Sequence, residues 1–253
     1  MMKEDFYAPH DRPLLEQAGL ADFDALWELE LTPVDDPNVD RGGWSSVCRL
    51  DLPEQSYYLK RQSNHLTRSF VRPFGEPTFC REFRNIQRYA ERGVPATKAA
   101  FFAVREQEGQ QCAVLLTRAL TDWRDLESWL NDWAQCHESD RQQLLIACAL
   151  LARRLHQAGL IHCCFYPRHI FVRGDEGGGF EACLIDLEKT RRLWRPVRDR
   201  VKDLEQFIRH APELNDDYVG LFLATYLDAP QHSAEVTQWR EWLQTRRQKK
   251  AGS

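Results

Sequence analysis

A polar loop followed by two short apolar segments, from Gly159 to Arg191, limits the possible folds of this chain more than any other stretch. The run 170–172 predicts one strand, and the run 182–185 predicts a second strand that ends on the acid Asp186. A carboxylate at the mouth of a buried strand can hold Mg²⁺, and the loop before the first strand can face the same spot. An Asp that merely caps a turn is an equally good interpretation of these segments alone.

Composition places the chain among folded globular proteins. Its 253 residues with a hydrophobic fraction of 43% can build a sizeable core, and 13 glycines and 12 prolines do not indicate disorder. The formal net charge of −4 argues against nucleic acid as the main partner.

Targeting signals and cysteine usage favour the cytoplasm. The first ten residues lack the apolar core of a signal peptide, and no stretch approaches the roughly 20 apolar residues that span a membrane. The eight cysteines form no C-x-x-C pair, and the adjacent Cys163 and Cys164 are a poor signature of zinc or of a disulfide. We therefore expect reduced thiols.

A glycine turn is the first candidate ligand-binding feature. Residues 1–30 carry apolar residues at helical spacing, and alternating apolar residues over 47–52 then predict the start of a β-hairpin beside Gly42 and Gly43. These small residues, together with Ser45, let backbone amides approach phosphates closely. A Gly-Gly pair is more often a simple turn.

A strand and a helix follow the glycine turn. The run 56–60 predicts a strand that ends on Lys60, which in isolation is best interpreted as a solvated lysine. Residues 77–90 predict a helix whose apolar stripe lies beside Glu82. Two further strands are predicted over 99–104 and 111–117, and a long amphipathic helix over 140–159.

The segment after Asp186 is strongly basic, with seven Lys or Arg residues against one Asp between Lys189 and Lys202. Such a run is often only a solvated face. Arginine side chains also suit phosphate and carboxylate groups, so this run is a candidate docking site for an anionic acceptor.

The polar loop that follows Gly159 resembles the catalytic loop of the protein-kinase-like fold. It resembles most closely that of the bacterial lipopolysaccharide core kinases, the heptose kinases and their InaA-type relatives. That family's loop reads H-x-D-x-Y-x-x-H before an apolar strand, and His162, Tyr166 and His169 match it at the same spacing. Asp186 then corresponds to the metal-binding Asp of the family. One position departs, because Cys164 stands where the family carries its catalytic Asp.

The resemblance implies a nucleotide site in the N-terminal half. Lys60 is placed as the ATP-orienting lysine, and Glu82 is placed to pair with it. The glycine turn would then approach the phosphates, and backbone groups near Thr117 to Ala119 would recognise adenine at a hinge between lobes.

In the C-terminal half, the resemblance implies that His162 is a scaffold residue beneath the metal site. His169 is expected to ligate metal or to bond phosphate, although a histidine satisfied by neighbouring backbone is nearly as good an interpretation. Asp203 resembles the acid that steadies the catalytic loop from below, with a surface helix acid as the alternative.

The resemblance predicts the α+β class and a protein-kinase-like two-lobed fold, with a small β-rich N-lobe and a larger helical C-lobe. We expect a single domain over 1–253. Its parts are an N-lobe over about 1–117 with a helical extension, a C-lobe over about 118–245, and a frayed polar tail over 246–253.

The function implied is that of an ATP-dependent sugar kinase of lipopolysaccharide core biosynthesis, which phosphorylates a heptose hydroxyl. It would use ATP and Mg²⁺, and an anionic glycolipid or other sugar acceptor, in the cytoplasm or peripherally at the inner membrane. The alternative is a pseudokinase that binds nucleotide or acts as a scaffold, because a Cys164 thiol is a poor substitute for a carboxylate. A kinase of small molecules, of the aminoglycoside or choline type, is a third and less favoured interpretation.

Overall fold

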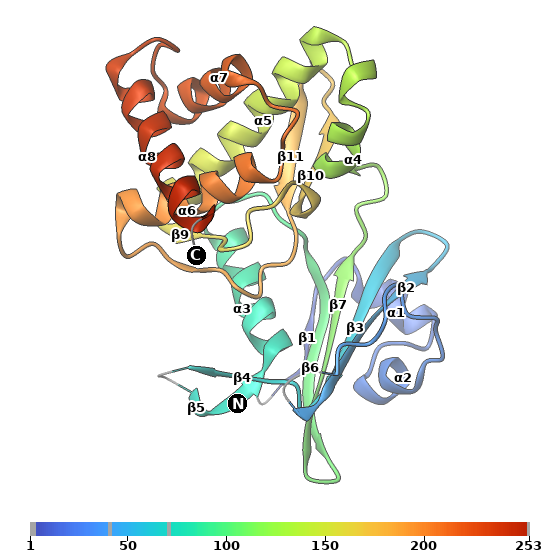
Figure 1. Ribbon diagram of the computed structural model, residues 1–253. Helices are drawn as coiled ribbons and strands as arrows, with labels where there is room; N and C mark the ends of the chain where they lie inside the picture. The colour runs from blue at the N-terminus through green and yellow to red at the C-terminus, as the bar shows by residue number, and fades with distance from the viewer. Residues whose placement is uncertain (1–3, 40–41, 70–71, 252–253) are drawn as a thin grey trace. The chain divides into compact units, whose positions relative to one another are not determined.

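The computed structural model describes residues 4–39, 42–69 and 72–251, and it divides into two compact units (Figure 1). The first unit contains residues 1–88 and 97–121, and the second contains 89–96 and 122–253. Residues 40 and 41 of the expected glycine turn, and 252 and 253 of the expected tail, lie outside the described residues.

The first unit is built on a five-stranded antiparallel sheet in the order β1-β6-β7-β3-β2. The elements of this unit are β1 (Phe6–Tyr7), α1 (Arg12–Gln17), α2 (Phe23–Glu28), β2 (Trp44–Asp51), β3 (Ser56–Ser63), β4 (Leu66–Ser69), β5 (Arg72–Pro77), α3 (Thr78–Glu91), β6 (Ala99–Gln107) and β7 (Gln110–Arg118). The last residues of α3 belong to the second unit. The strands expected over 56–60, 99–104 and 111–117 and the helix expected over 77–90 are thereby confirmed.

Alternation along the strands of this sheet gives it two apolar faces. Phe101 and its neighbours on one face join Leu15, Phe23 and Leu26 of α1 and α2 in a buried cluster. Phe102 points to the opposite face, where its ring stacks on Phe83 of α3 at 4.3 Å between centroids. Figure 1 shows α3 on one side of the sheet and α1 and α2 on the other.

The second unit is mainly helical. Its elements are β8 (Arg124–Asp125), α4 (Leu126–Asn131), η2 (Trp133–Gln135), α5 (Glu138–Gln157), β9 (Leu160–Ile161), η3 (Pro167–His169), β10 (Ile170–Gly174), β11 (Phe180–Leu184), β12 (Arg191–Arg192), α6 (Pro196–Arg209), α7 (Asp216–Leu227) and α8 (Ala234–Ala251). The central helix α5 is buried along most of its length. The chain leaves it at Gly159, whose φ of 70° requires the left-handed conformation that glycine adopts readily.

The structure refines one expectation about the ends of the chain and corrects another. The helical pattern in residues 1–30 belongs to two short helices, α1 and α2, with Gly19 at φ 69° between them. At the other end, residues 246–251 are helical, since α8 continues to Ala251. Arg246 and Lys250 lie 3.6 and 3.4 Å from the buried Glu205 carboxylate of α6, which anchors the polar end of α8.

Among the described residues, no helix combines the length and the apolar character needed to cross a membrane.

Candidate phosphotransfer site

A short ion pair is the centre of the candidate nucleotide site in the first unit. Lys60 of β3 points to the α3 face of the sheet, where its Nζ lies 2.6 Å from Glu82 Oε1. The Glu82 side chain is only 2% exposed, whereas Lys60 keeps 18% of its side chain accessible. The expected pairing of Lys60 with Glu82 is therefore present. The carboxylate is buried, and the lysine side chain is the partner that remains partly accessible.

The glycine turn is packed more tightly than a flexible loop would be. Gly42 has a φ of 75°, and a Cβ at Gly43 would come within 2.2 Å of the Ser63 carbonyl oxygen. Only glycine fits at Gly43, because backbone fills the space that a side chain would need. Ser45 exchanges both backbone hydrogen bonds with Asn38, at 2.8 and 2.9 Å. The Ser45 amide is therefore committed to a backbone partner rather than open to a phosphate.

The backbone of the expected adenine-binding segment is also largely committed within the first unit. Thr117 pairs with Tyr58 and Ala99 in the sheet ladder, and the Ala119 amide donates to the Ser56 carbonyl oxygen at 2.8 Å. Adenine recognition at Thr117 and Ala119 remains a prediction.

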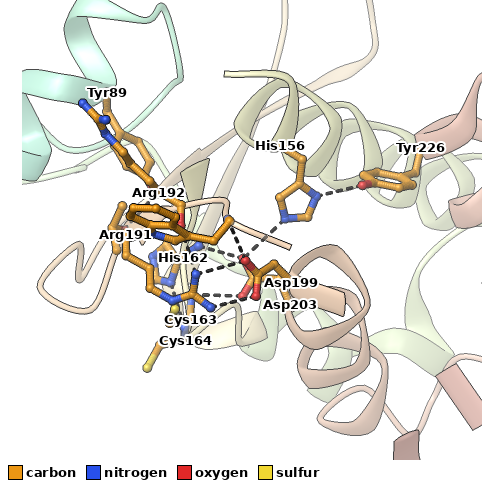
Figure 2. Close-up of polar contacts among 12 residues, drawn as sticks. Tyr89, His156, His162, Cys163, Cys164, Arg191, Arg192, Asp199, Asp203 and Tyr226 are labelled. Carbon is orange, nitrogen blue, oxygen red and sulfur yellow. Dashed lines mark hydrogen bonds and ion pairs between the residues drawn. The ribbon is translucent and has the colours of Figure 1, made fainter. Parts of the chain in front are cut away.

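In the second unit, Asp203 of α6 holds the loop that follows β9. Its carboxylate accepts hydrogen bonds from the amides of His162 at 2.7 Å and Cys163 at 2.9 Å (Figure 2). The Asp203 side chain is fully buried. His156 Nε2 lies 3.4 Å from the same carboxylate, and its Nδ1 lies 2.9 Å from the Tyr226 hydroxyl. Two orphan amides of a tight loop are thus satisfied by one buried acid.

Ile185 ties Asp186 to this loop through its backbone. The Ile185 amide donates to the His169 carbonyl oxygen at 3.0 Å, and the Ile185 carbonyl oxygen lies 2.9 Å from Nε2 of the buried His162. His162 therefore acts within the fold, between the loop and the end of β11, and is closed to a ligand.

Asp186 and His169 form the open part of the site. Asp186 has a φ of 56° and a side chain that is 41% exposed, and His169 Nε2 lies 3.5 Å from its Oδ2. Positive φ at a non-glycine residue costs free energy, and such conformations persist where the surrounding contacts impose them, often at functional sites. Burial lowers the pKa of His169 despite the nearby Asp186 carboxylate, which keeps the imidazole neutral and able to donate an electron pair.

This pair suits a cation that takes its other ligands from phosphate and water. In the part of the chain that the structure describes, no group of three or more His, Cys, Asp or Glu side chains could hold a metal. Mg²⁺ is commonly bound by one or two carboxylates plus substrate phosphates and water, so the single exposed carboxylate of Asp186 fits that mode better than it fits a closed structural site. The His169 imidazole would add a nitrogen ligand, which Mg²⁺ takes less readily than oxygen.

Comparison with known proteins identifies the family. The family model described as "Lipopolysaccharide kinase (Kdo/WaaP) family" matches residues 24–226. The chain belongs to the lipopolysaccharide kinase (Kdo/WaaP) family. It is also 33% identical to Protein InaA of Escherichia coli (strain K12) over 206 residues, which cover 79% of this chain and 94% of InaA.

The fold of this lipopolysaccharide kinase family member agrees with a solved structure. The structure described as "WaaP in complex with acyl carrier protein" matches with a TM-score of 0.71 and covers 97% of this chain and 98% of that one, at 21% identity. The mixed helix and strand composition, with a strand-rich first unit and a mainly helical second unit, confirms the expected fold class.

Cys164 is the position at which this lipopolysaccharide kinase family member departs from the expected loop. The residue is buried, with 6% of its surface exposed, and burial raises the pKa of its thiol further than nearby Lys189 lowers it. Its carbonyl oxygen lies 2.9 Å from His169 Nδ1. The thiol is therefore protonated at neutral pH, and the backbone of Cys164 orients the candidate metal ligand.

Sequence reasoning missed Asp199, which organises the segment after Asp186. The Asp199 carboxylate pairs with both terminal nitrogens of Arg191 and accepts from the amides of Trp194 and Arg195, so the pKa of Asp199 is held well below its usual range. A local signal was available, because Asp199 stands three residues after Pro196, in the first turn of α6. Acids are favoured there, where they can accept from the free amides at the start of a helix.

Proposed function

We propose that this protein is an ATP-dependent kinase that phosphorylates a sugar hydroxyl of the lipopolysaccharide core, with a heptose hydroxyl as the acceptor. Membership of a lipopolysaccharide kinase family implies the use of ATP and a divalent metal. The observation that carries the proposal is the pairing of an exposed Asp186 with a neutral His169 on a loop anchored by Asp203.

The residues of the chain divide the work between binding phosphate and binding metal. Lys60, fixed by Glu82, would orient phosphate oxygens, while Asp186 and His169 would hold Mg²⁺. When bound, Mg²⁺ would neutralise negative charge on the phosphate oxygens. Phosphoryl transfer depends mainly on positioning and electrostatic stabilisation, so these residues could support transfer without a carboxylate base.

The acceptor and the place of action follow from the same proposal. A lipid-linked core sugar would meet the enzyme at the cytoplasmic face of the inner membrane, with the protein bound there peripherally. We also propose that both units belong to one protein-kinase-like domain, since each holds a part that phosphoryl transfer requires.

The proposal is tested by titrating Mg²⁺ and ATP into the protein by calorimetry, and by following radiolabelled phosphate from ATP into core oligosaccharide. Lys60→Ala and Asp186→Ala are expected to lose at least about tenfold in ATP affinity and to abolish transfer. Lys98→Ala and Asp217→Ala remove the same charges from exposed positions and serve as matched controls. Absence of Mg²⁺-dependent ATP binding by the wild type would refute the proposal.

A pseudokinase is the second candidate, and the buried Cys164 favours it. The substitution Cys164→Asp separates the two. An acceptor-orienting carboxylate is worth roughly 10² to 10⁴-fold in rate, so a slow kinase should gain transfer activity on this scale if Asp is accommodated. ATP binding without transfer in both the wild type and this variant would support the pseudokinase, with circular dichroism as the check that the variant folds.

A further inference from the structure

A strongly basic pocket lies at the start of α6. It has a volume of about 420 Å³, and the side chains that line it come from the segment after Asp186 and from α8: Arg191, Trp194, Arg195, Arg198, Asp199, Lys202 and Arg246. Five of these seven residues are cations and one is an acid. Four of the seven cations in the basic run after Asp186 are therefore gathered in one pocket, and Arg246 is added from α8.

The positive charge of this pocket is not balanced from within. The Asp199 carboxylate is already paired with the Arg191 guanidinium, through contacts of 2.8 and 3.0 Å. The Arg246 guanidinium lies 3.6 Å from the Glu205 carboxylate. Within residues 4–39, 42–69 and 72–251, no carboxylate comes within ion-pair distance of Arg195, Arg198 or Lys202. Three uncompensated cations around one cavity suit an anionic group.

The pocket is held in shape before any ligand arrives. Asp199 is 4% exposed and fixes the turn at Trp194 and Arg195 through both of their amides, at 2.9 and 3.0 Å. The strand β12 is paired with β9, with Arg191 opposite Ile161. Figure 2 shows Arg191 and Asp199 beside the loop that carries Cys163 and Cys164. A preorganised site loses less entropy when it binds.

An apolar groove adjoins the basic pocket. It has a volume of about 540 Å³ and is lined by Val197, Arg198, Val201, Trp242, Thr245, Arg246, Lys249 and Lys250. The two cavities share Arg198 and Arg246. Trp194 is 75% exposed and Val197 is 46% exposed, so large apolar side chains stand at the surface among the cations. This combination is typical of proteins that bind anionic membrane surfaces, where Trp rings enter the interface and cations meet phosphates.

We propose that this pocket and groove bind the phosphate headgroup and upper acyl region of an anionic membrane lipid. The inference deepens the proposed membrane association and does not depend on phosphoryl transfer. An acidic protein would also satisfy the cations, but the exposed Trp194 and Val197 and the apolar groove favour a ligand with a headgroup and a chain.

The test is sedimentation of the whole chain with vesicles of phosphatidylcholine alone and with vesicles in which about a third of the lipid is phosphatidylglycerol. The wild type should bind only the anionic vesicles, and high salt should weaken the binding. Each surface cation contributes about fivefold to such partitioning, so Arg195→Gln with Arg198→Gln should reduce it about 25-fold. Trp194→Ala should also weaken it, with no change in salt dependence.

The matched control is Arg12→Gln with Lys98→Gln, which removes two positive charges from the first unit and should bind as the wild type does. The inference is overturned if the wild type ignores anionic vesicles, if it binds both vesicles equally, or if the control loses as much as the pocket variant. Displacement by millimolar inorganic phosphate would reassign the pocket to a soluble phosphate. ATP binding measured on the same samples keeps the outcomes distinct, because a protein that binds Mg²⁺ and ATP but no vesicle retains the proposed function and loses only this inference.

Discussion

Two aspartates of the second unit, Asp203 and Asp186, have the same side chain in opposite environments. Asp203 is fully buried and its oxygens accept from two loop amides, whereas Asp186 is 41% exposed at its side chain and contacts His169 at 3.5 Å. A buried carboxylate whose oxygens already accept hydrogen bonds stabilises the fold and has no lone pair open to a ligand. An exposed carboxylate on a residue with positive φ keeps its lone pairs for a ligand. Burial and partners, rather than residue type, thus separate the structural acid from the candidate metal ligand.

The largest effect should come from Asp203→Ala. The substitution leaves the amides of His162 and Cys163 buried without an acceptor, and hydrogen bonds to charged groups contribute about 1.5 to 3 kcal/mol each. We expect the free energy of unfolding to fall by about 3 to 5 kcal/mol, measured by urea denaturation. Asp203→Asn keeps one acceptor oxygen and should lose about half as much. A loss below about 1 kcal/mol for the Ala variant would show that the loop does not depend on this acid.

Asp199→Ala should have an intermediate effect, because Asp199 is buried like Asp203 but its main partner, Arg191, is partly exposed. We expect a loss of about 2 kcal/mol in urea denaturation at pH 7. The pKa of Asp199 is lowered in the folded state by Arg191, so this stabilisation is present above the unfolded pKa near about 4 and is lost as the pH falls below it. The difference between wild type and variant should therefore shrink in acid. A difference that stays constant down to about pH 2 would contradict the ion pair.

A smaller effect is expected from His169. Its folded pKa is lowered by burial, so the unfolded chain binds the proton more readily, and the fold loses stability as the pH falls below about 6.5. His169→Asn should remove about 1 kcal/mol or less of this loss between about pH 7 and pH 5. His210 has a pKa lowered in the same direction, so the difference between variant and wild type is the quantity to measure. If the free energy of unfolding varied with pH in the same way for the wild type and for His169→Asn, His169 would not be shielded from water.

The smallest effect on stability should come from Asp186→Ala. This residue forms no buried hydrogen bond among the contacts of the described residues, and we expect urea denaturation to change by about 0.5 kcal/mol or less. Asp186→Gly should stabilise the fold by roughly 1 kcal/mol, since glycine adopts positive φ without the cost borne by other residues. A stability loss as large as that of Asp203→Ala would remove the distinction between the two acids.

Much of the fold could be predicted from local patterns. Alternation and helical periodicity locate β3, β6, β7, α3 and α5 to within a few residues, because each pattern records which face of an element is buried. The match of His162, Tyr166 and His169 to the family's loop pattern located the loop, and the resemblance also led to the expected contact of Asp203 with that loop, which is present.

The remaining features depend on contacts between segments far apart in the chain. Spacing gave Cys164 a place in the loop, but its burial is decided by the packing around it. The same holds for the role of Asp199, for the helical end of α8 and for the pocket that joins Arg246 to the run after Asp186.

Periodicity and spacing are properties of the chain read in order, which is why they were enough to locate the elements and, through the resemblance to a known family, the loop and its candidate ligands. Burial and charge balance are properties of neighbours in space. Only the folded chain could therefore show which acids are buried, which cations of the basic pocket lack a carboxylate partner, and which thiol is closed to solvent.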